Sequence, residues 1–186
     1  MTAAQPLRRK GRVLPGWIDY NEHMMDGYYL VAFTDATDAC LETLGFGPEY
    51  RARSGSTVYT VESHINFLRE ARLGDDLEYE TLLLGVDERR LRMFHTMLRG
   101  VTGEVLATSE LMLLHVDLQL GRVSPMPPQS ILLAQSMAET HATLGWPANA
   151  GRAISMDPRR TGDASSSTRG GSGGDETGIM GEHGPG

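Results

Sequence analysis

Apolar residues recur every three or four positions from about residue 27 to 44, and every second position from residue 56 onward. The first spacing indicates a helix with one buried face. We expect this helix to open near Asp26 and to stop at Gly45 and Gly47, where glycine can adopt the left-handed conformation. The second spacing is typical of strands, expected at residues 56–68, 77–86, 91–101 and 105–118. Sequential strands with short links pair with their neighbours, so the order predicts a long helix followed by a four-stranded antiparallel meander.

Weaker signals describe the two ends of the chain. A strand is expected from Gly11 to Tyr20, and Pro15-Gly16 within it indicates a bulge or an edge position, because proline cannot donate to a ladder. A helical turn is expected at 48–53, and a proline-rich break at 124–128 precedes a terminal helix at 129–144. Residues 1–10 read as a polar lead-in, and the Gly/Ser-rich tail at 148–186 has too few apolar residues to fold. One domain is therefore predicted at 11–147, with a disordered tail after it.

The strand predicted at 56–68 has two distinct faces. The face that we expect to be buried carries Tyr59, Val61, Ser63, Ile65 and Phe67. The other face carries Glu62, His64 and Asn66. These polar residues either face solvent or form a second wall of a pocket in a partner subunit.

Composition and charge restrict the classes of function. At 186 residues with 40% hydrophobic content, the chain is long enough for one packed domain. Its net charge of −7 disfavours a nucleic-acid partner, because phosphates require a basic face. No apolar run approaches the roughly 20 residues of a membrane span, so we expect a soluble cytoplasmic protein. The single cysteine, Cys40, lies in an apolar helical pattern, which favours a buried structural thiol over a nucleophile.

A cluster of polar residues directly precedes the long helix. Asp19, Asn21 and His23 lie in a predicted turn, and Asp26 is the expected N-cap of the helix. The free N–H groups and the positive dipole end of a helix N-terminus bind an anion or a developing oxyanion. This arrangement favours acyl transfer. In the alternative interpretation, the polar residues only cap the turn and the helix.

The segment at residues 19–29, DYNEHMMDGYY, resembles the D-x-x-G-H-V-N-N-x-x-Y signature of the 4-hydroxybenzoyl-CoA thioesterase-like acyl-CoA thioesterases. The order of one strand, a long helix and four strands also resembles their α+β hotdog fold, in which a curled antiparallel sheet wraps one long central helix. The resemblance covers roughly residues 10–145. It is nearest to the thioesterase domains associated with carnitine dehydrogenase, which are assigned to betainyl-CoA. The chain departs from the signature where Glu22 replaces Gly and where Met25-Asp26 replaces Asn-Asn.

The resemblance implies roles for the residues of the turn. Asp19 is implied to be the catalytic carboxylate, acting as nucleophile or general base, with a first-turn backbone N–H as the oxyanion donor. His23 is implied to orient Asp19 or to contact the thioester, and holding the turn is its structural alternative. Asn21 and Asp26 are expected beside the substrate.

The resemblance implies hydrolysis of a short acyl-CoA, without a cofactor, in a homodimer or a dimer of dimers. A betainyl group is the narrower expectation for the acyl part. Two other functions stay open at this point. One is a non-catalytic acyl-CoA-binding or structural hotdog module that partners a larger enzyme, and the other is an acyl-thioester dehydratase.

Charge and aromaticity suggest the substrate contacts. CoA phosphates need cations, and the candidates are Arg89 and Arg90 beside Arg92, with Arg69 and Arg72; scattered surface arginine is the alternative. A quaternary-ammonium acyl group needs an aromatic cage, for which the candidates are Trp17, Tyr20, Tyr28 and Tyr59, with core packing as the alternative. The spacing of His64, His95 and His115 matches no metal motif, so no metal is expected.

Overall fold

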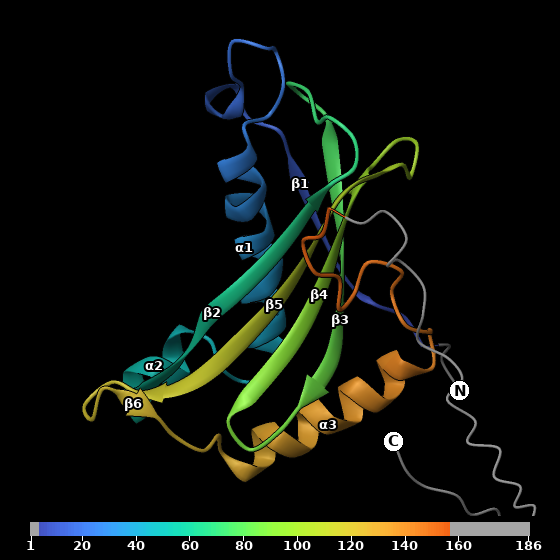
Figure 1. Ribbon diagram of the computed structural model, residues 1–186. Coiled ribbons are helices and arrows are strands. Elements are labelled where there is room, and N and C mark those ends of the chain that lie inside the picture. Colours follow the sequence, from blue (N-terminus) through green and yellow to red (C-terminus); the bar gives the residue numbers. More distant parts are fainter. Residues whose placement is uncertain (1–3, 157–186) are drawn as a thin grey trace, which may run out of the picture. The chain divides into compact units, whose positions relative to one another are not determined.

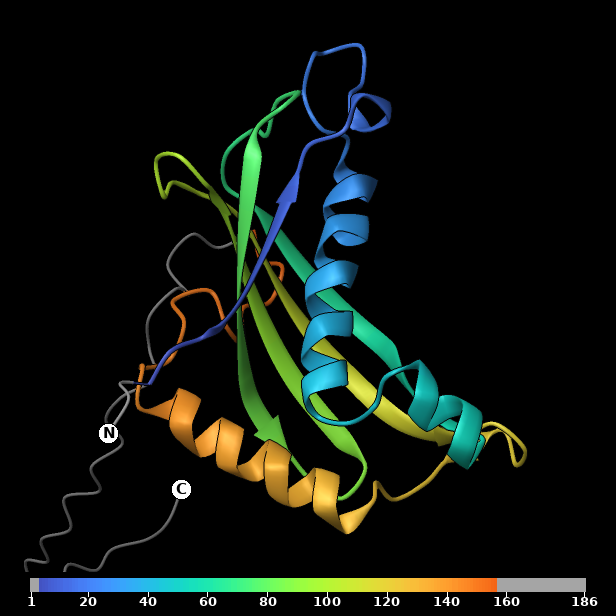
Figure 2. The ribbon, with the colours of Figure 1, turned by 180° about the vertical axis from the view of Figure 1, so that it is seen from behind.

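A curved antiparallel sheet wraps one side of a long helix (Figure 1), and the view from behind shows this helix lying in front of the sheet (Figure 2). The computed structural model describes residues 4–156. In chain order the elements are β1 (Leu7–Arg12), a 3-10 turn η1 (Pro15–Trp17), α1 (Asp26–Thr43), α2 (Pro48–Ser54), β2 (Ser56–Phe67), β3 (Asp76–Val86), β4 (Arg90–Arg99), β5 (Val105–Asp117), β6 (Arg122–Val123) and α3 (Pro128–Ala142). The predicted disordered tail falls largely outside the described residues and stays a prediction.

The strand order is β1-β3-β4-β5-β2, with β6 beside β5, and all the pairings are antiparallel. The predicted meander is correct for β3, β4 and β5 but wrong for β2, which pairs with β5 at the opposite edge from β1. The reason is the link at residues 68–75. The N–H groups of Leu68 and Arg69 both bond to the carbonyl of Leu106, and the carbonyl of Ala71 accepts from Met24. The link is thus tied to β5 and to the start of α1, so it makes no hairpin into β3.

The first strand lies earlier than predicted. It pairs Leu7 with Thr81 and ends at Arg12 opposite Asp76, so part of the predicted lead-in belongs to the sheet. Pro15 then begins the 3-10 turn, where its fixed φ and missing N–H cost nothing. The expected strand at 11–20 was therefore wrong in its bounds.

The long helix agrees with the prediction and supplies much of the core. Tyr29, Ala32, Phe33 and Ala36 on α1 are buried against the sheet. Cys40 is also buried, which raises the pKa of its thiol to about 12 and confirms the structural interpretation. Gly45 has a φ of 85° and ends the helix region as expected, whereas the backbone of Gly47 is not left-handed.

A buried polar network crosses the core between α1 and the sheet. His95 on β4 has its Nε2 atom 3.0 Å from the hydroxyl of Thr37 and its Nδ1 atom 2.8 Å from the hydroxyl of Thr81. The ring of Phe33 stacks on the imidazole at 5.7 Å. Because complete burial disfavours the charged ring, the pKa of His95 falls to about 3.

The face of β2 that was expected to be buried is largely open. Tyr59, Val61 and Phe67 are 50%, 54% and 52% exposed. β2 is an edge strand with a register shift between Thr60 and Glu62. The space between β2 and α1 is a groove of about 420 Å³ rather than packed core. Alternation alone could not show that no element within residues 4–156 covers this face.

The terminal helix packs beside β3, as Figure 2 shows. Its predicted bounds are confirmed within two residues. His141 on α3 accepts the N–H of Leu83 through Nδ1 at 2.9 Å, which ties the helix to that strand. No helix within residues 4–156 is long and apolar enough to cross a bilayer.

Candidate active site

The turn at residues 19–23 is closed by its own backbone. The N–H of Asp19 donates to the carbonyl of His23 at 3.0 Å, and the N–H of Glu22 donates to the carbonyl of Asp19 at 3.1 Å. The Asp19 carboxylate accepts the backbone N–H of Asn21 at 2.8 Å and its side-chain amide at 3.2 Å. Asp19 and Asn21 are thus brought together, with the carboxylate oriented by the turn.

The charge on Asp19 is stabilised by the same contacts. Desolvation raises the pKa of Asp19, but the hydrogen bonds from Asn21 and from the backbone of His23 together lower it by more. The net shift is downward, so the carboxylate is ionised at neutral pH. An ionised carboxylate is the form that can act as a nucleophile or as a general base.

Glu22 occupies the position at which the resembled signature has glycine. Its φ is 66°, and among the described residues it is the only non-glycine with positive φ. The glutamate is therefore a non-glycine residue in the left-handed region, at a cost in backbone strain.

The helix start is held by neighbouring segments. The N–H of Met25 donates to the carbonyl of Trp17 at 2.9 Å, and Met25, with extended backbone, is the N-cap. The prediction that Asp26 caps the helix was wrong by one residue, because this bond fixes Met25 outside the helix. Asp26 is the first helical residue, and its carboxylate accepts the N–H of Gly27 at 2.7 Å. Within residues 4–156 the N–H of Asp26 has no hydrogen-bond acceptor.

A pocket of about 310 Å³ lies beside this helix start. It is lined by His23, Met24, Asp26, Tyr29, Phe67, Leu68, Arg69 and Glu70. His23 and Glu70 meet in it, with 2.8 Å between Nε2 and a carboxylate oxygen. Glu70 comes from the β2–β3 link, 47 positions after His23, and no sequence signal connected the two. Asp19 does not line the pocket within one chain.

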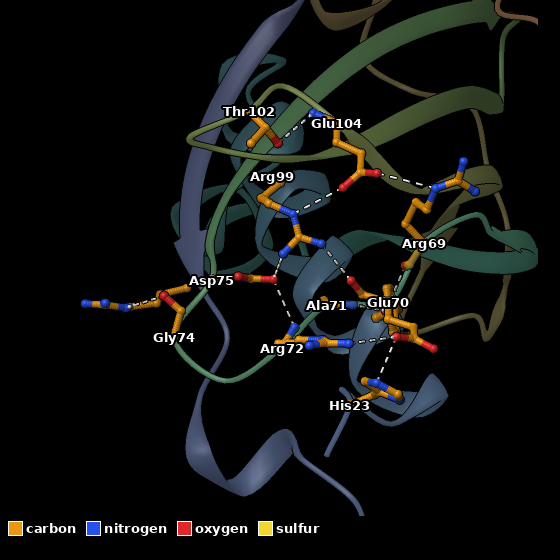
Figure 3. Close-up of polar contacts among 12 residues, drawn as sticks. His23, Arg69, Glu70, Ala71, Arg72, Gly74, Asp75, Arg99, Thr102 and Glu104 are labelled. Atoms are coloured by element: carbon orange, nitrogen blue, oxygen red, sulfur yellow. Dashed lines mark hydrogen bonds and ion pairs between the residues drawn. The ribbon is translucent and has the colours of Figure 1, made fainter. Parts of the chain in front are cut away.

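A network of arginines and carboxylates adjoins the pocket (Figure 3). Arg69 lies 3.4 Å from Glu104, and Arg72 lies 3.5 Å from Glu70. Arg99 pairs with Asp75 and with Glu104. A second hollow of about 340 Å³ lies among these side chains, and Arg69 and Glu70 line both hollows. The two cavities therefore adjoin each other.

Of the four aromatic residues predicted to form a cage, the structure brings two into contact within one chain. Trp17 and Tyr28 stack on each other with 5.8 Å between ring centroids, and both pack against the core. Tyr20 is 93% exposed. Tyr59 lies on β2 eight residues before Phe67, roughly 26 Å away along the strand.

The arginines predicted to meet CoA divide into two groups. Arg69 and Arg72 lie beside the pocket. Arg89 and Arg90 lie at the β3–β4 turn, at the opposite end of β4 from Arg99, and Arg90 pairs with Asp87 at 2.6 Å. No metal-binding group of three His, Cys, Asp or Glu side chains occurs in the described part of the chain.

Comparisons with known proteins agree with this architecture. Residues 13–135 match the model of the Thioesterase-like superfamily. Over 148 residues the chain is 40% identical to the betainyl-CoA thioesterase of Pseudomonas aeruginosa. The matched region is 80% of this chain and 93% of that protein. Over 127 residues it is 48% identical to the L-carnitine dehydrogenase/betainyl-CoA thioesterase of Agrobacterium fabrum. This matched region is 68% of this chain and 26% of that protein.

A solved structure with a low sequence identity shares the fold. It is a Staphylococcus aureus protein in complex with CoA, with a TM-score of 0.78 at 24% identity, over 84% of this chain and 99% of that chain. The family match and the relatives together identify the chain. It belongs to the Thioesterase-like superfamily and is a thioester hydrolase with the hotdog fold.

Proposed function

We propose that this thioesterase hydrolyses betainyl-CoA, a short acyl-CoA with a quaternary ammonium group, to the free acid and CoA. The relative from Pseudomonas aeruginosa supports this substrate, because the similarity extends over 93% of its length. The structural observation that carries the proposal is the pocket in which the His23–Glu70 pair and the first residue of α1 meet. An acyl-binding pocket at a helix N-terminus suits a reaction that develops negative charge on the carbonyl oxygen.

In the proposed reaction the thioester oxygen binds at the start of α1. The unpaired N–H of Asp26 is the oxyanion donor, and such a donor contributes on the order of 3 kcal/mol to transition-state stabilisation. Asp19 supplies the carboxylate. It takes a proton from water, whose oxygen attacks the carbonyl carbon, or it attacks directly to give a mixed anhydride that water then hydrolyses. In either route the C–S bond breaks and the CoA thiolate leaves.

His23 is proposed to contact the reacting thioester. If its Nε2–H donates to Glu70, the other ring nitrogen stays available to the substrate. Glu70 then acts as a positioning residue that orients the imidazole. Asn21 holds Asp19 through two hydrogen bonds, which lower the pKa of its carboxyl.

The CoA nucleotide is proposed to lie over the adjoining arginine network. Arg69 and Arg72 lie 3.4 and 3.5 Å from carboxylates, Arg69 also donates to the carbonyl of Leu68 at 2.8 Å, and both side chains are two-thirds exposed. Phosphate oxygens can therefore compete for them. Only a partner subunit could bring Arg89 and Arg90 to this pocket.

The open edge of the sheet supports a homodimer, or a dimer of dimers. Leu30 and Val31 on α1, with Tyr59 and Val61 on β2, are exposed on adjacent elements. An exposed edge strand with apolar side chains is a surface that natural proteins cover. A second copy of this chain is the proposed cover, which would also complete the pocket around Asp19.

Asp19→Asn tests the catalytic assignment. Asparagine can still accept the Asn21 N–H and keep the turn, so we expect folding to be unaffected and kcat for betainyl-CoA to fall by about 100-fold or more. Thiol release measures the rate. Asp117→Asn is the matched control, because Asp117 closes a turn by accepting two backbone N–H groups at 2.9 Å outside the site. Equal rates in both variants would remove Asp19 from its role.

A non-catalytic acyl-CoA-binding module is the competing function. The position of Asp19 outside the pocket lining of one chain is the observation in its favour. It predicts CoA binding with no thiol release from any acyl-CoA. The family relationship favours the hydrolase.

A further inference from the structure

One wall of the pocket is aromatic. The Tyr29 hydroxyl accepts the N–H of Ala71 at 3.0 Å and donates to the carbonyl of Arg69 at 3.4 Å, so the ring is fixed between α1 and the β2–β3 link. Phe67 meets it edge-on, with 5.1 Å between centroids, yet remains 52% exposed. Phe67 therefore presents apolar aromatic surface to a ligand in the pocket.

The charge on the pocket wall is mainly negative. Asp26 and Glu70 contribute carboxylates to its lining. Arg69 is the only arginine or lysine of the lining, and its guanidinium turns away to Glu104 and to the carbonyl of Leu68, as Figure 3 shows for Glu104. The pocket thus combines aromatic faces with carboxylates, the two features that attract a cation without hydrogen-bond donors.

Asp26 is the residue that links this charge to catalysis. It occupies a position where the resembled signature has asparagine, so a neutral amide is replaced by a carboxylate of the same shape. Its own N–H is the proposed oxyanion donor. A carboxylate beside a developing oxyanion raises the energy of the transition state for a neutral acyl group. A positive charge one methylene away from the carbonyl offsets that repulsion.

We propose that Asp26, with Phe67 and Tyr29, selects for a quaternary ammonium in the acyl group. The trimethylammonium lies against the aromatic pair and beside the Asp26 carboxylate. This inference rests on the proposed thioesterase function and adds to it the residues that determine acyl specificity. It places the ammonium on residues other than Trp17, Tyr20, Tyr28 and Tyr59, whose cage stays a prediction.

The test compares betainyl-CoA with 3,3-dimethylbutanoyl-CoA, in which carbon replaces the ammonium nitrogen at the same shape. The quantity measured is the ratio of kcat/KM for the two thioesters in the wild type, Asp26→Asn and Phe67→Leu. The intrinsic reactivity of each thioester cancels when the ratio of a variant is divided by that of the wild type. Glu139→Gln, an exposed carboxylate on α3, is the matched control for loss of charge.

We expect Asp26→Asn to lower the ratio by about tenfold, because the carboxylate that favours the ammonium is lost. Phe67→Leu keeps an apolar side chain but removes the π face, and we expect a decrease of about fivefold. Glu139→Gln leaves the ratio unchanged. Unaltered ratios in both test variants, with both thioesters hydrolysed, would overturn the specificity assignment alone. No hydrolysis of either thioester by the wild type would overturn the proposed function with it.

Discussion

Glu22→Gly removes backbone strain from the turn that carries Asp19 and His23. Glu22 holds φ at 66° in an exposed position, and its N–H still closes the turn on the carbonyl of Asp19. The structure shows no side-chain hydrogen bond or ion pair of Glu22 within the described chain. Replacement by glycine therefore relieves the strain of the left-handed conformation and removes no side-chain hydrogen bond or ion pair.

The expected gain is a balance of two opposing effects. A non-glycine residue in the left-handed region costs about 1–2 kcal/mol. Glycine also increases the entropy of the unfolded chain, which offsets about 0.5–1 kcal/mol of the stability gained by removing the strain. Glu22→Gly should therefore raise the free energy of unfolding by about 0.5–1 kcal/mol. For a chain of this size, that corresponds to an increase in Tm of about 1–4 °C.

Urea unfolding and thermal melting measure the difference. Glu22→Ala is the matched control, because it removes the charge but keeps the Cβ atom that causes the strain, and we expect it to differ little from the wild type. If Glu22→Gly and Glu22→Ala have the same stability, backbone strain at residue 22 does not destabilise the protein. A less stable Glu22→Gly variant would refute the reasoning, because it would mean that the glutamate side chain stabilises the turn.

Two further predictions concern the core and the pocket wall. Burial lowers the pKa of His95 to about 3, below its unfolded value near 6.5. The contribution of the neutral imidazole to the free energy of unfolding is therefore complete above pH 6.5 and is lost as pH falls toward 3. Between pH 7 and pH 5 this loss is about 2 kcal/mol, measurable by urea unfolding at each pH; an equal loss in His95→Gln would contradict it. Tyr29→Phe leaves the buried N–H of Ala71 without its acceptor and should cost about 1–3 kcal/mol. Unchanged stability, with unchanged hydrogen-exchange protection of that amide, would show that the bond is dispensable.

The sequence predicted most of the elements and one end of the site. The helical spacing at residues 27–44 and the alternation in β3, β4 and β5 gave bounds close to those observed, because each pattern reflects local burial on one face. The signature at 19–29 likewise located the turn and the helix start. These features are contiguous in the chain, so their residues are neighbours whatever the rest of the fold does.

The strand order and the second half of the pocket were not predictable in the same way. Alternation in β2 indicates a strand but not its partner, and only the contacts of the 68–75 link with Leu106 and Met24 place β2 beside β5. The same contacts bring Glu70 to His23 and Phe67 to Tyr29.

By itself, the amino-acid sequence determined which segments are helix or strand and where the polar turn before the long helix lies. Only the tertiary structure decided which distant residues complete the pocket and which apolar face stays open. The physical reason is that periodicity reports how each residue is buried along its own element. Pairing between elements depends on where the connecting segments are anchored, and here those anchors are backbone hydrogen bonds, which leave little trace in side-chain identity.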